Sequence, residues 1–138
     1  MLELIKLDAE RANQTIDYML KRNLSEDVIR KIVLDKNFTK THWRYLSETQ
    51  DLSEVFIREF KDRVDWVEIC IYQKLSEDFI REFQDRVDWF WLSGFQKLSQ
   101  NFIREYKDKV NWVYIFEYQK LSKSFRYEFR HKQLPAEL

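Results

Sequence analysis

Glycine and proline are almost missing from this chain. One Gly and one Pro occur in 138 residues, whereas hairpins and all-β folds depend on glycine, Asn-Gly pairs and proline for their turns. Cysteine is equally scarce, and the single Cys70 cannot form an internal disulfide. The apolar runs are only a few residues long, far below the roughly 20 residues that span a bilayer. These absences argue against a β fold, a disulfide scaffold and a membrane span, and they favour an all-α protein.

Net charge is also missing, because 24 acidic side chains balance 24 basic ones. Neutrality removes any whole-chain electrostatic argument for binding nucleic acid or an anionic membrane. The first residues, MLELIKLDAER, place charges where a signal peptide needs an apolar core. We therefore expect an intracellular protein of a reducing compartment, with a length that suits one compact domain or one short repeat array.

Internal repetition is what the sequence has in abundance. A step of 23 residues separates the Leu-Ser pairs that begin at Leu52, Leu75, Leu98 and Leu121. The same step relates the tryptophans Trp43, Trp66, Trp89 and Trp112. An earlier partial copy, LSEDVIRKI at residues 24–32, is followed by five extra residues before its tryptophan. The pattern predicts a tandem array of about five units, the first irregular and the last truncated.

Each unit contains two signals for the start of a helix. In residues 75–97, Ser76 is a strong N-cap, and Glu77 and Asp78 place negative charge at the positive end of the helix dipole. Asp88 is the second N-cap. We expect a helix A over about residues 76–85 and a helix B over about residues 89–97. Helices this short depend on packing against their neighbours for stability.

The charged residues of helix A are spaced for a solvated ion-pair face. Arg81 and Asp85 stand four positions apart, as do Glu82 and Arg86, and such pairs stabilise helices. In one unit the run from Asp65 to Glu68 also has the pattern of a capping box. We therefore interpret these charges as parts of the scaffold.

The predicted fold is all-α, a short α/α solenoid with five A-type helices, four B-type helices and an N-terminal covering helix. Residues 1–23 would hold the covering helix, formed over about 8–22, and residues 24–51 a divergent first repeat with an insertion. Three regular repeats would occupy residues 52–120, and a truncated capping repeat residues 121–138. In the capping repeat Arg126 replaces an isoleucine of the inner copies, as a terminal unit requires.

The LSxxFIRxFxDxVxW units resemble the short tandem helical repeats in proteins of amoeba-infecting giant DNA viruses, including those of the marseillevirus type. The resemblance covers residues 24–132 and is carried by the three clean copies in residues 52–120. It implies a viral protein that acts in the host cytoplasm or is carried in the virion. It implies little about activity, because the repeat pattern specifies a scaffold.

No catalytic site, metal or cofactor is expected. Carboxylates such as Glu82 and Asp85 have basic residues four positions away and recur in other units, whereas an enzyme needs one site with displaced pKa values. Cys70, His42 and His131 lack the short spacing of metal ligands. A single glycine also excludes a Gly-rich phosphate loop.

The positions that differ between copies are where surface chemistry can vary. Helix B has two such columns, which contain Glu68, Trp91 and Tyr114, and one turn later Ile71, Gly94 and Glu117. If exposed, Trp91 and Tyr114 would be rigid anchors of a protein interface; the alternative is that they only pack between B helices. We predict a non-enzymatic interaction or structural module that binds a host protein, a viral protein or a second copy of itself.

The alternative hypothesis is a virion or viral-factory component that contacts DNA. The C-terminal piece is the basic part of the chain, with Lys123, Arg126, Arg130 and Lys132. Such a cluster can neutralise phosphates. The middle units argue against an extended DNA surface, because residues 75–97 carry three basic and five acidic side chains.

Overall fold

The computed structural model describes residues 2–133, with side-chain surroundings from Ala9 onward. Within that range the chain forms ten α-helices and one 3-10 helix, and no strand. The all-α prediction is therefore confirmed. None of the described helices combines the length and apolar character needed to cross a bilayer. The chain divides into two compact units, the first ending at Gln73 and the second beginning at Lys74.

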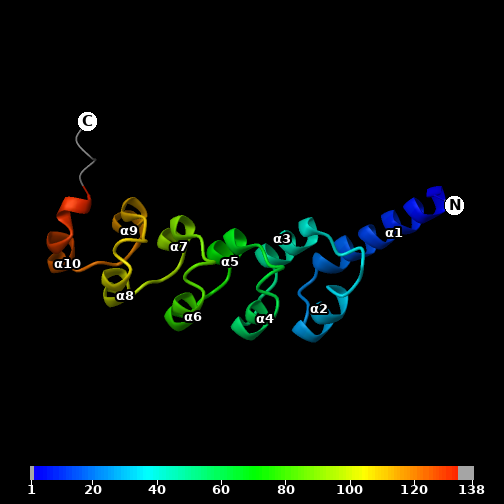
Figure 1. Cartoon of the computed structure of the whole chain (residues 1–138), viewed down its shortest axis with the longest axis horizontal. Helices are drawn as coiled ribbons and strands as arrows, with labels where there is room; N and C mark the ends of the chain where they lie inside the picture. The colour runs from blue at the N-terminus through cyan, green and yellow to red at the C-terminus, as the bar shows by residue number, and fades with distance from the viewer. Residues whose placement is uncertain (1, 134–138) are drawn as a thin grey trace. The chain divides into compact units, whose positions relative to one another are not determined.

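The first unit contains α1 to α5. Their bounds are α1 (Leu2–Leu20), α2 (Glu26–Ile32), α3 (Lys40–Thr49), α4 (Glu54–Glu59) and α5 (Trp66–Tyr72). Helix α3 packs against both α1 and α5 (Figure 1). Its Leu46 is fully buried, as are Ile29 and Ile69 of the neighbouring helices. Helix α1 begins and ends earlier than the expected range of residues 8–22.

The second unit contains α6 to α10 and the 3-10 helix η1. Their bounds are α6 (Glu77–Glu82), α7 (Trp89–Phe95), α8 (Gln100–Glu105), α9 (Trp112–Tyr118), α10 (Lys123–Glu128) and η1 (Arg130–Lys132). Within this unit α7 packs against α9, and Figure 1 shows α6 and α8 on the opposite side from α7 and α9. The even-numbered helices from α2 to α10 are A-type, and the odd-numbered helices from α3 to α9 are B-type. The predicted helix pairs are therefore confirmed.

The repeated serines cap the A helices as predicted. The hydroxyls of Ser53, Ser76, Ser99 and Ser122 each accept a hydrogen bond of 3.1 Å from the N–H group three residues later. Such a cap contributes about 1 kcal/mol. Asp65, Asp88 and Asn111 cap the B helices in the same manner. These caps define the starts of α4 to α10, whereas Ser25 at the start of α2 makes no side-chain cap hydrogen bond.

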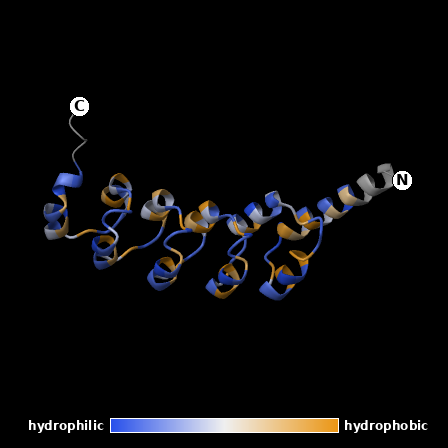
Figure 2. Cartoon of the chain, viewed as in Figure 1, coloured by the Kyte–Doolittle hydropathy of each residue, from blue (hydrophilic) through white to orange (hydrophobic). Residues whose placement is uncertain are grey.

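The helices end earlier than expected. Helix α6 stops at Glu82 because Phe83 leaves the helical region, with φ −108° and ψ 27°. Helix α7 stops at Phe95 because Gln96 is extended, with φ −90° and ψ 144°. The A helices bury an apolar stripe and leave charged residues outward, so both orange and blue residues occur along them in Figure 2.

A column of buried glutamines, Gln50, Gln73, Gln96 and Gln119, follows the B helices. The side-chain amide of Gln119 donates to the carbonyls of Ser93 (2.8 Å) and Gln96 (2.7 Å), and its oxygen accepts from the N–H group of Leu98 (3.1 Å). Gln73 makes the equivalent three bonds in the first unit. Each glutamine thus satisfies backbone groups that would otherwise be buried without a partner. The sequence interpretation missed this role.

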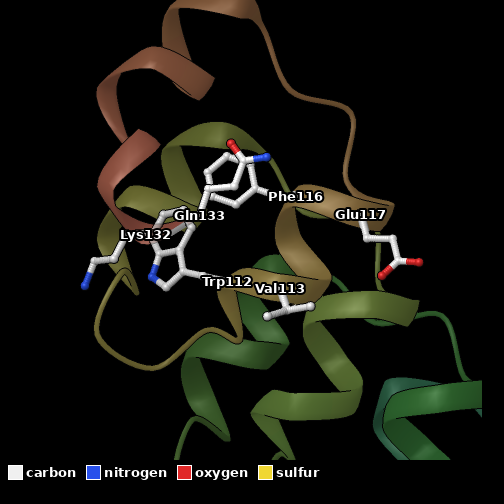
Figure 3. A pocket seen from close by; sticks show the side chains of 6 residues that line it. All are labelled: Trp112, Val113, Phe116, Glu117, Lys132 and Gln133. Atoms are coloured by element: carbon white, nitrogen blue, oxygen red, sulfur yellow. The ribbon is translucent and has the colours of Figure 1, made fainter. Parts of the chain in front are cut away.

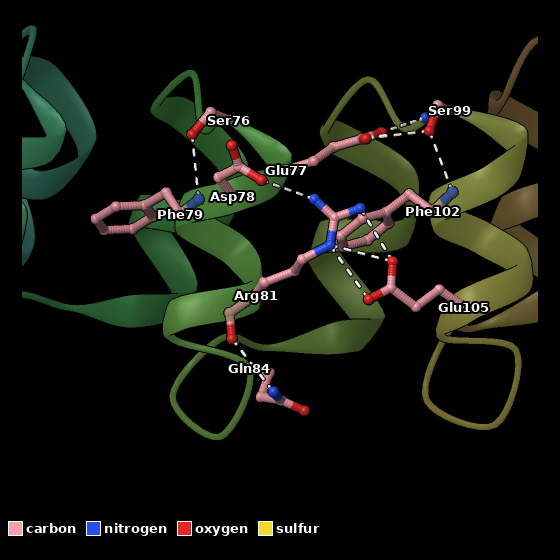
Figure 4. A network of polar contacts seen from close by, with 9 residues as sticks. All are labelled: Ser76, Glu77, Asp78, Phe79, Arg81, Gln84, Ser99, Phe102 and Glu105. Carbon is pink, nitrogen blue, oxygen red and sulfur yellow. Dashed lines mark hydrogen bonds and ion pairs between the residues drawn. The ribbon is translucent and has the colours of Figure 1, made fainter.

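Ion pairs form both within one A helix and between successive A helices. Arg81 pairs with Asp78 (2.9 Å) and with Glu105 of the next repeat (3.0 Å), while Asp85 pairs with Lys109 (3.6 Å). Figure 4 shows the Arg81 guanidinium between the two carboxylates. Its hydrogen bond to Glu105 raises the pKa of Arg81. The predicted Arg81–Asp85 pair is wrong, because α6 ends at Glu82 and Asp85 lies in the turn beyond it.

The predicted capping box between Asp65 and Glu68 is also wrong. The N–H group of Asp65 donates to the hydroxyl of Ser47 (3.1 Å), so the Glu68 carboxylate is not its acceptor. Glu68 accepts instead from Nε of Arg44, at 2.8 Å. The N–H group of Asp65 and the carboxylate of Glu68 therefore both find their partners on the preceding B helix, α3.

The irregular first repeat has a capping box of its own. The Thr39 hydroxyl caps α3, and Nδ1 of His42 accepts from the Thr39 N–H group at 2.8 Å. Nε2 of the same buried histidine lies 3.1 Å from a carboxylate oxygen of Asp17 on α1. His42 thus connects the start of α3 to the covering helix α1. This contact gives a structural role to a residue that departs from the repeat pattern.

Candidate partner-binding surface

The six residues predicted to bind a partner divide between the two units. In the first unit, Ile71 is half-buried and Glu68 is buried, with 7% of its surface exposed. The Glu68 carboxylate is already occupied by Arg44. Glu68 therefore has no unpaired carboxylate to offer a partner, because its carboxylate is already paired with Arg44.

The other four lie on two packed helices of the second unit. Trp91 and Gly94 are on α7, while Tyr114 and Glu117 are on α9. The rings of Trp91 and Tyr114 have centroids 6.4 Å apart and meet at 64°. Both are half-buried, and Glu117 is exposed. The structure thus brings Trp91, Gly94 and Tyr114 together, packed between B helices and still partly open to solvent.

Three further aromatic residues join this cluster, and sequence reasoning missed them. Phe90, Phe95 and Tyr118 are 44%, 54% and 58% exposed. The Phe90 ring lies 5.0 Å from that of Trp91 and 4.5 Å from that of Tyr114. Phe95 contacts Trp91 at 5.9 Å, and Tyr118 contacts Tyr114 at 5.4 Å. We call these five residues, Phe90, Trp91, Phe95, Tyr114 and Tyr118, the aromatic face.

The aromatic face forms because the two helices together contain only one charged residue. Helix α7 reads WFWLSGF, and it fully buries Leu92 and Ser93. Helix α9 reads WVYIFEY, with Glu117 as its single charged residue. The chain as a whole is 35% charged. This local lack of charge was the sequence signal that could have identified Phe90 and Phe95.

The aromatic face has one polar group that can only donate, the indole N–H group of Trp91, and tyrosine hydroxyls that can donate or accept. Among the described residues, neither Nε1 of Trp91 nor the hydroxyl of Tyr114 has a hydrogen-bond partner. By contrast, Nε1 of Trp89 donates to the Gln84 carbonyl at 3.0 Å, as Trp112 does to its own turn. At the edge of the face, the negative charge of Glu117 raises the pKa of Tyr118.

The four cations of the DNA hypothesis lie on α10 and η1 and are all exposed: Lys123, Arg126, Arg130 and Lys132. The Arg126 guanidinium lies over the Phe116 ring and donates to the Phe116 carbonyl at 3.3 Å. Arg130 lies 4.0 Å from the centroid of the Tyr127 ring and donates to the carbonyl of the same residue. Two of the four cations therefore have both ring and carbonyl contacts inside the protein.

A hollow of about 270 Å³ lies between α9 and the residues at the end of η1. Figure 3 shows the rings of Trp112 and Phe116 beside Lys132 and Gln133, with the Glu117 carboxylate turned away from them. In the repeat, Phe116 stands at the position that corresponds to Ser93. The Ser93 hydroxyl accepts a hydrogen bond from the N–H group of Asn111, the N-cap residue of α9. No B helix follows α10 in the described chain, and Phe116 closes this end with its ring.

Comparison with protein-family models, with curated proteins and with solved structures finds no match. Among the side chains that the structure describes, from residue 9 to 133, no group of three or more His, Cys, Asp or Glu is placed to hold a metal ion.

Proposed function

We propose that this protein is a non-enzymatic helical-repeat module that binds another protein through the aromatic face of α7 and α9. One observation carries the proposal: five aromatic rings in mutual contact lie on two adjacent helices that have one charged side chain between them. Apolar residues that are exposed singly are normal on soluble proteins, whereas clustered ones point to an interaction site. Tryptophan and tyrosine are also enriched among the residues that dominate binding energy.

The contacts within the aromatic face support binding because they fix the rings before a partner arrives. Phe90 touches both Trp91 and Tyr114, so three rings restrain one another. Rigid aromatic side chains lose little conformational entropy on binding, which leaves more of their contact energy for affinity. A preformed cluster of this kind suits recognition better than a set of independent flexible side chains.

The charged side of the repeat gives less support for a binding role. Arg81 and Arg104 each pair with a glutamate of the following A helix, at 3.0 Å, and each lies over the phenylalanine that the helix buries. These contacts stabilise the stack of A helices. The resemblance of the repeats to giant-virus proteins supports a viral role for the module, in an infected cell or in the virion.

A paired capture experiment tests the proposed function. The immobilised full chain and its Trp91→Ala/Tyr114→Ala variant are exposed to a lysate of amoebal cells, the host class that the resemblance implies. We expect proteins that bind the wild type to be lost on the variant and kept on Tyr127→Ala, which removes an exposed aromatic ring (68%) from α10. Equal capture by the wild type and the double variant would exclude the aromatic face as the binding surface.

The same samples test the DNA hypothesis. Affinity for DNA falls steeply as salt rises, because binding releases counterions from the phosphates. An aromatic protein interface depends much less on salt. Retention of duplex DNA at low salt that is lost at physiological salt, and that depends on Lys123, Arg126, Arg130 and Lys132, would favour the C-terminal basic site instead. Sedimentation of the purified chain shows whether a second copy occupies the aromatic face.

A further inference from the structure

The size of the aromatic face limits what can bind it. Helices α7 and α9 have seven residues each, and a helix of that length extends about 10 Å. Two such helices packed about 8–10 Å apart present a face on the order of 200 Å². Stable interfaces between folded proteins bury about 800 Å² on each partner. The aromatic face is therefore of a size that suits a short peptide segment.

The hydrogen-bonding groups of the face limit the ligand further. Trp91 Nε1 is a donor only, and the Tyr114 hydroxyl is a second group able to donate. Among the described residues both lack a partner. A ligand that buries these groups has to supply acceptors, since an unpaired buried donor costs about 1–3 kcal/mol. The matching ligand therefore has free acceptors that can reach the Trp91 indole, while the Tyr114 hydroxyl can pair with a donor or an acceptor.

Three common ligands fit this requirement poorly. An amphipathic helix uses its backbone carbonyls internally, so its backbone has few acceptors left for Trp91. A β-strand brings N–H groups that need acceptors, and residues 2–133 contain no strand edge to pair with it. A second copy of this chain would need a larger contact than the aromatic face offers, since stable interfaces between folded proteins bury about 800 Å² on each partner.

A proline-rich segment in the polyproline II conformation meets the requirement. Proline has a carbonyl and no N–H group. Polyproline II has no internal hydrogen bonds, so its carbonyls remain free. Its stiffness also lowers the entropy lost on binding, and aromatic surfaces are its usual docking sites.

We infer that the aromatic face binds an extended proline-rich segment of a partner protein. This inference rests on the proposed function, because it assigns a ligand class to the same surface. Proline rings pack on Phe90, Trp91 and Tyr114, while ligand carbonyls accept from the Trp91 indole and the Tyr114 hydroxyl. The Trp91 and Tyr114 centroids are 6.4 Å apart, close to the rise of two polyproline II residues at about 3.1 Å each. Residues two positions apart in one segment can therefore contact the two rings.

The test uses the full chain labelled with ¹⁵N, in which the five tryptophans each give one indole N–H resonance. It is titrated with a twelve-residue proline-rich peptide and, separately, with an alanine-based helical peptide of equal length. We expect the Trp91 resonance to shift saturably with the proline-rich peptide only. The Trp91→Phe/Tyr114→Phe variant keeps both rings and removes both donors, and it should bind at least about tenfold more weakly. Tyr127→Phe, which removes a hydroxyl from α10, should bind as the wild type does.

Three results would overturn the inference: no shift of Trp91 at millimolar proline-rich peptide, equal affinity of the double phenylalanine variant, or preference for the helical peptide. The capture experiment then decides the proposed function separately. If capture still depends on Trp91 and Tyr114, the face binds a ligand of another class and the proposed function stands. If capture is also independent of them, both are wrong.

Discussion

The backbone of Gly94 lies directly against the ring of Tyr114. A Cβ atom at position 94 would stand 2.7 Å from Cδ2 of that ring and 3.3 Å from Cε2. The only glycine of the chain does not have a positive φ, so its backbone conformation does not require glycine. Glycine within a helix costs roughly 0.5–1 kcal/mol relative to alanine. Its use here is the close approach that lets Tyr114 pack beside Phe90 and Trp91.

Substitution of Gly94 by alanine tests this relationship. Alanine favours the helix by about 0.5–1 kcal/mol, but its methyl group has to displace the Tyr114 ring. We expect the free energy of unfolding to change by less than about 0.5 kcal/mol, because the two effects oppose each other and the half-exposed ring can swing outward. Binding through the aromatic face should weaken, since the ring cluster is disrupted.

The Tyr114→Ala background provides the control for Gly94→Ala. With the ring removed, the methyl group meets no obstacle, and Gly94→Ala should stabilise the protein by about 0.5–1 kcal/mol. Urea denaturation of the four proteins of this double-mutant cycle gives the coupling energy directly. A coupling energy of zero would show that the close approach of Gly94 and Tyr114 has no energetic consequence.

Two phenylalanines of neighbouring elements should differ sharply in their contribution to stability. Phe79 is 1% exposed and Phe90 is 44% exposed. Phe79→Ala should cost about 3–5 kcal/mol, because it leaves a cavity in the core. Phe90→Ala should cost no more than about 1 kcal/mol and mainly reduce binding. Thermal or urea unfolding of both variants checks this separation of scaffold from surface, which would be wrong if Phe90→Ala were the more destabilising change.

The glutamine column predicts a large effect from a change of similar volume. Gln119→Leu removes three hydrogen bonds and leaves the Ser93 and Gln96 carbonyls and the Leu98 N–H group without that partner. Because each buried unpaired group costs about 1–3 kcal/mol, we expect a loss of about 3 kcal/mol or more in the free energy of unfolding. Gln14→Leu on α1, an exposed position, serves as the control and should be nearly neutral. A neutral Gln119→Leu would contradict the structural role of this column.

The ion pairs between A helices predict a smaller effect that depends on salt. Arg81→Gln removes the contacts to Asp78 and Glu105. These groups are substantially exposed, and exposed pairs contribute little and are screened by salt. We expect a small decrease in the urea midpoint that shrinks further in high salt. A decrease as large as that of Gln119→Leu, or one independent of salt, would show that the pair is not a screened surface contact.

The helix pairs could be predicted from the sequence because their signals are local. Ser76 caps α6 through a bond to a residue three positions away, so the spacing alone defines the start of the helix. The helix ends were placed too late, because Phe83 and Gln96 leave the helical conformation although the local pattern does not indicate it. Gln96 is the clearest case: its oxygen accepts from the N–H group of Leu75, 21 residues earlier in the chain.

The candidate surface was predicted only in part for a similar reason. Comparison of the copies identified Trp91, Gly94 and Tyr114, because these positions differ from their counterparts. It missed Phe90 and Phe95, whose outward direction follows from which side of α7 packs against α9. It also treated Glu68 as part of the same surface, although Arg44 of the preceding B helix pairs with it and buries it. Such contacts between repeats cannot be obtained from one unit alone.

Affinity selection from a random peptide library on the immobilised full chain tests the central claim most directly. The selected peptides are then measured against the wild type, Trp91→Ala/Tyr114→Ala and Tyr127→Ala, with the fold of each variant checked by circular dichroism. If the aromatic face is the binding surface, the peptides should lose at least about tenfold in affinity on the double variant and none on Tyr127→Ala. Equal affinity for all three proteins would contradict the account.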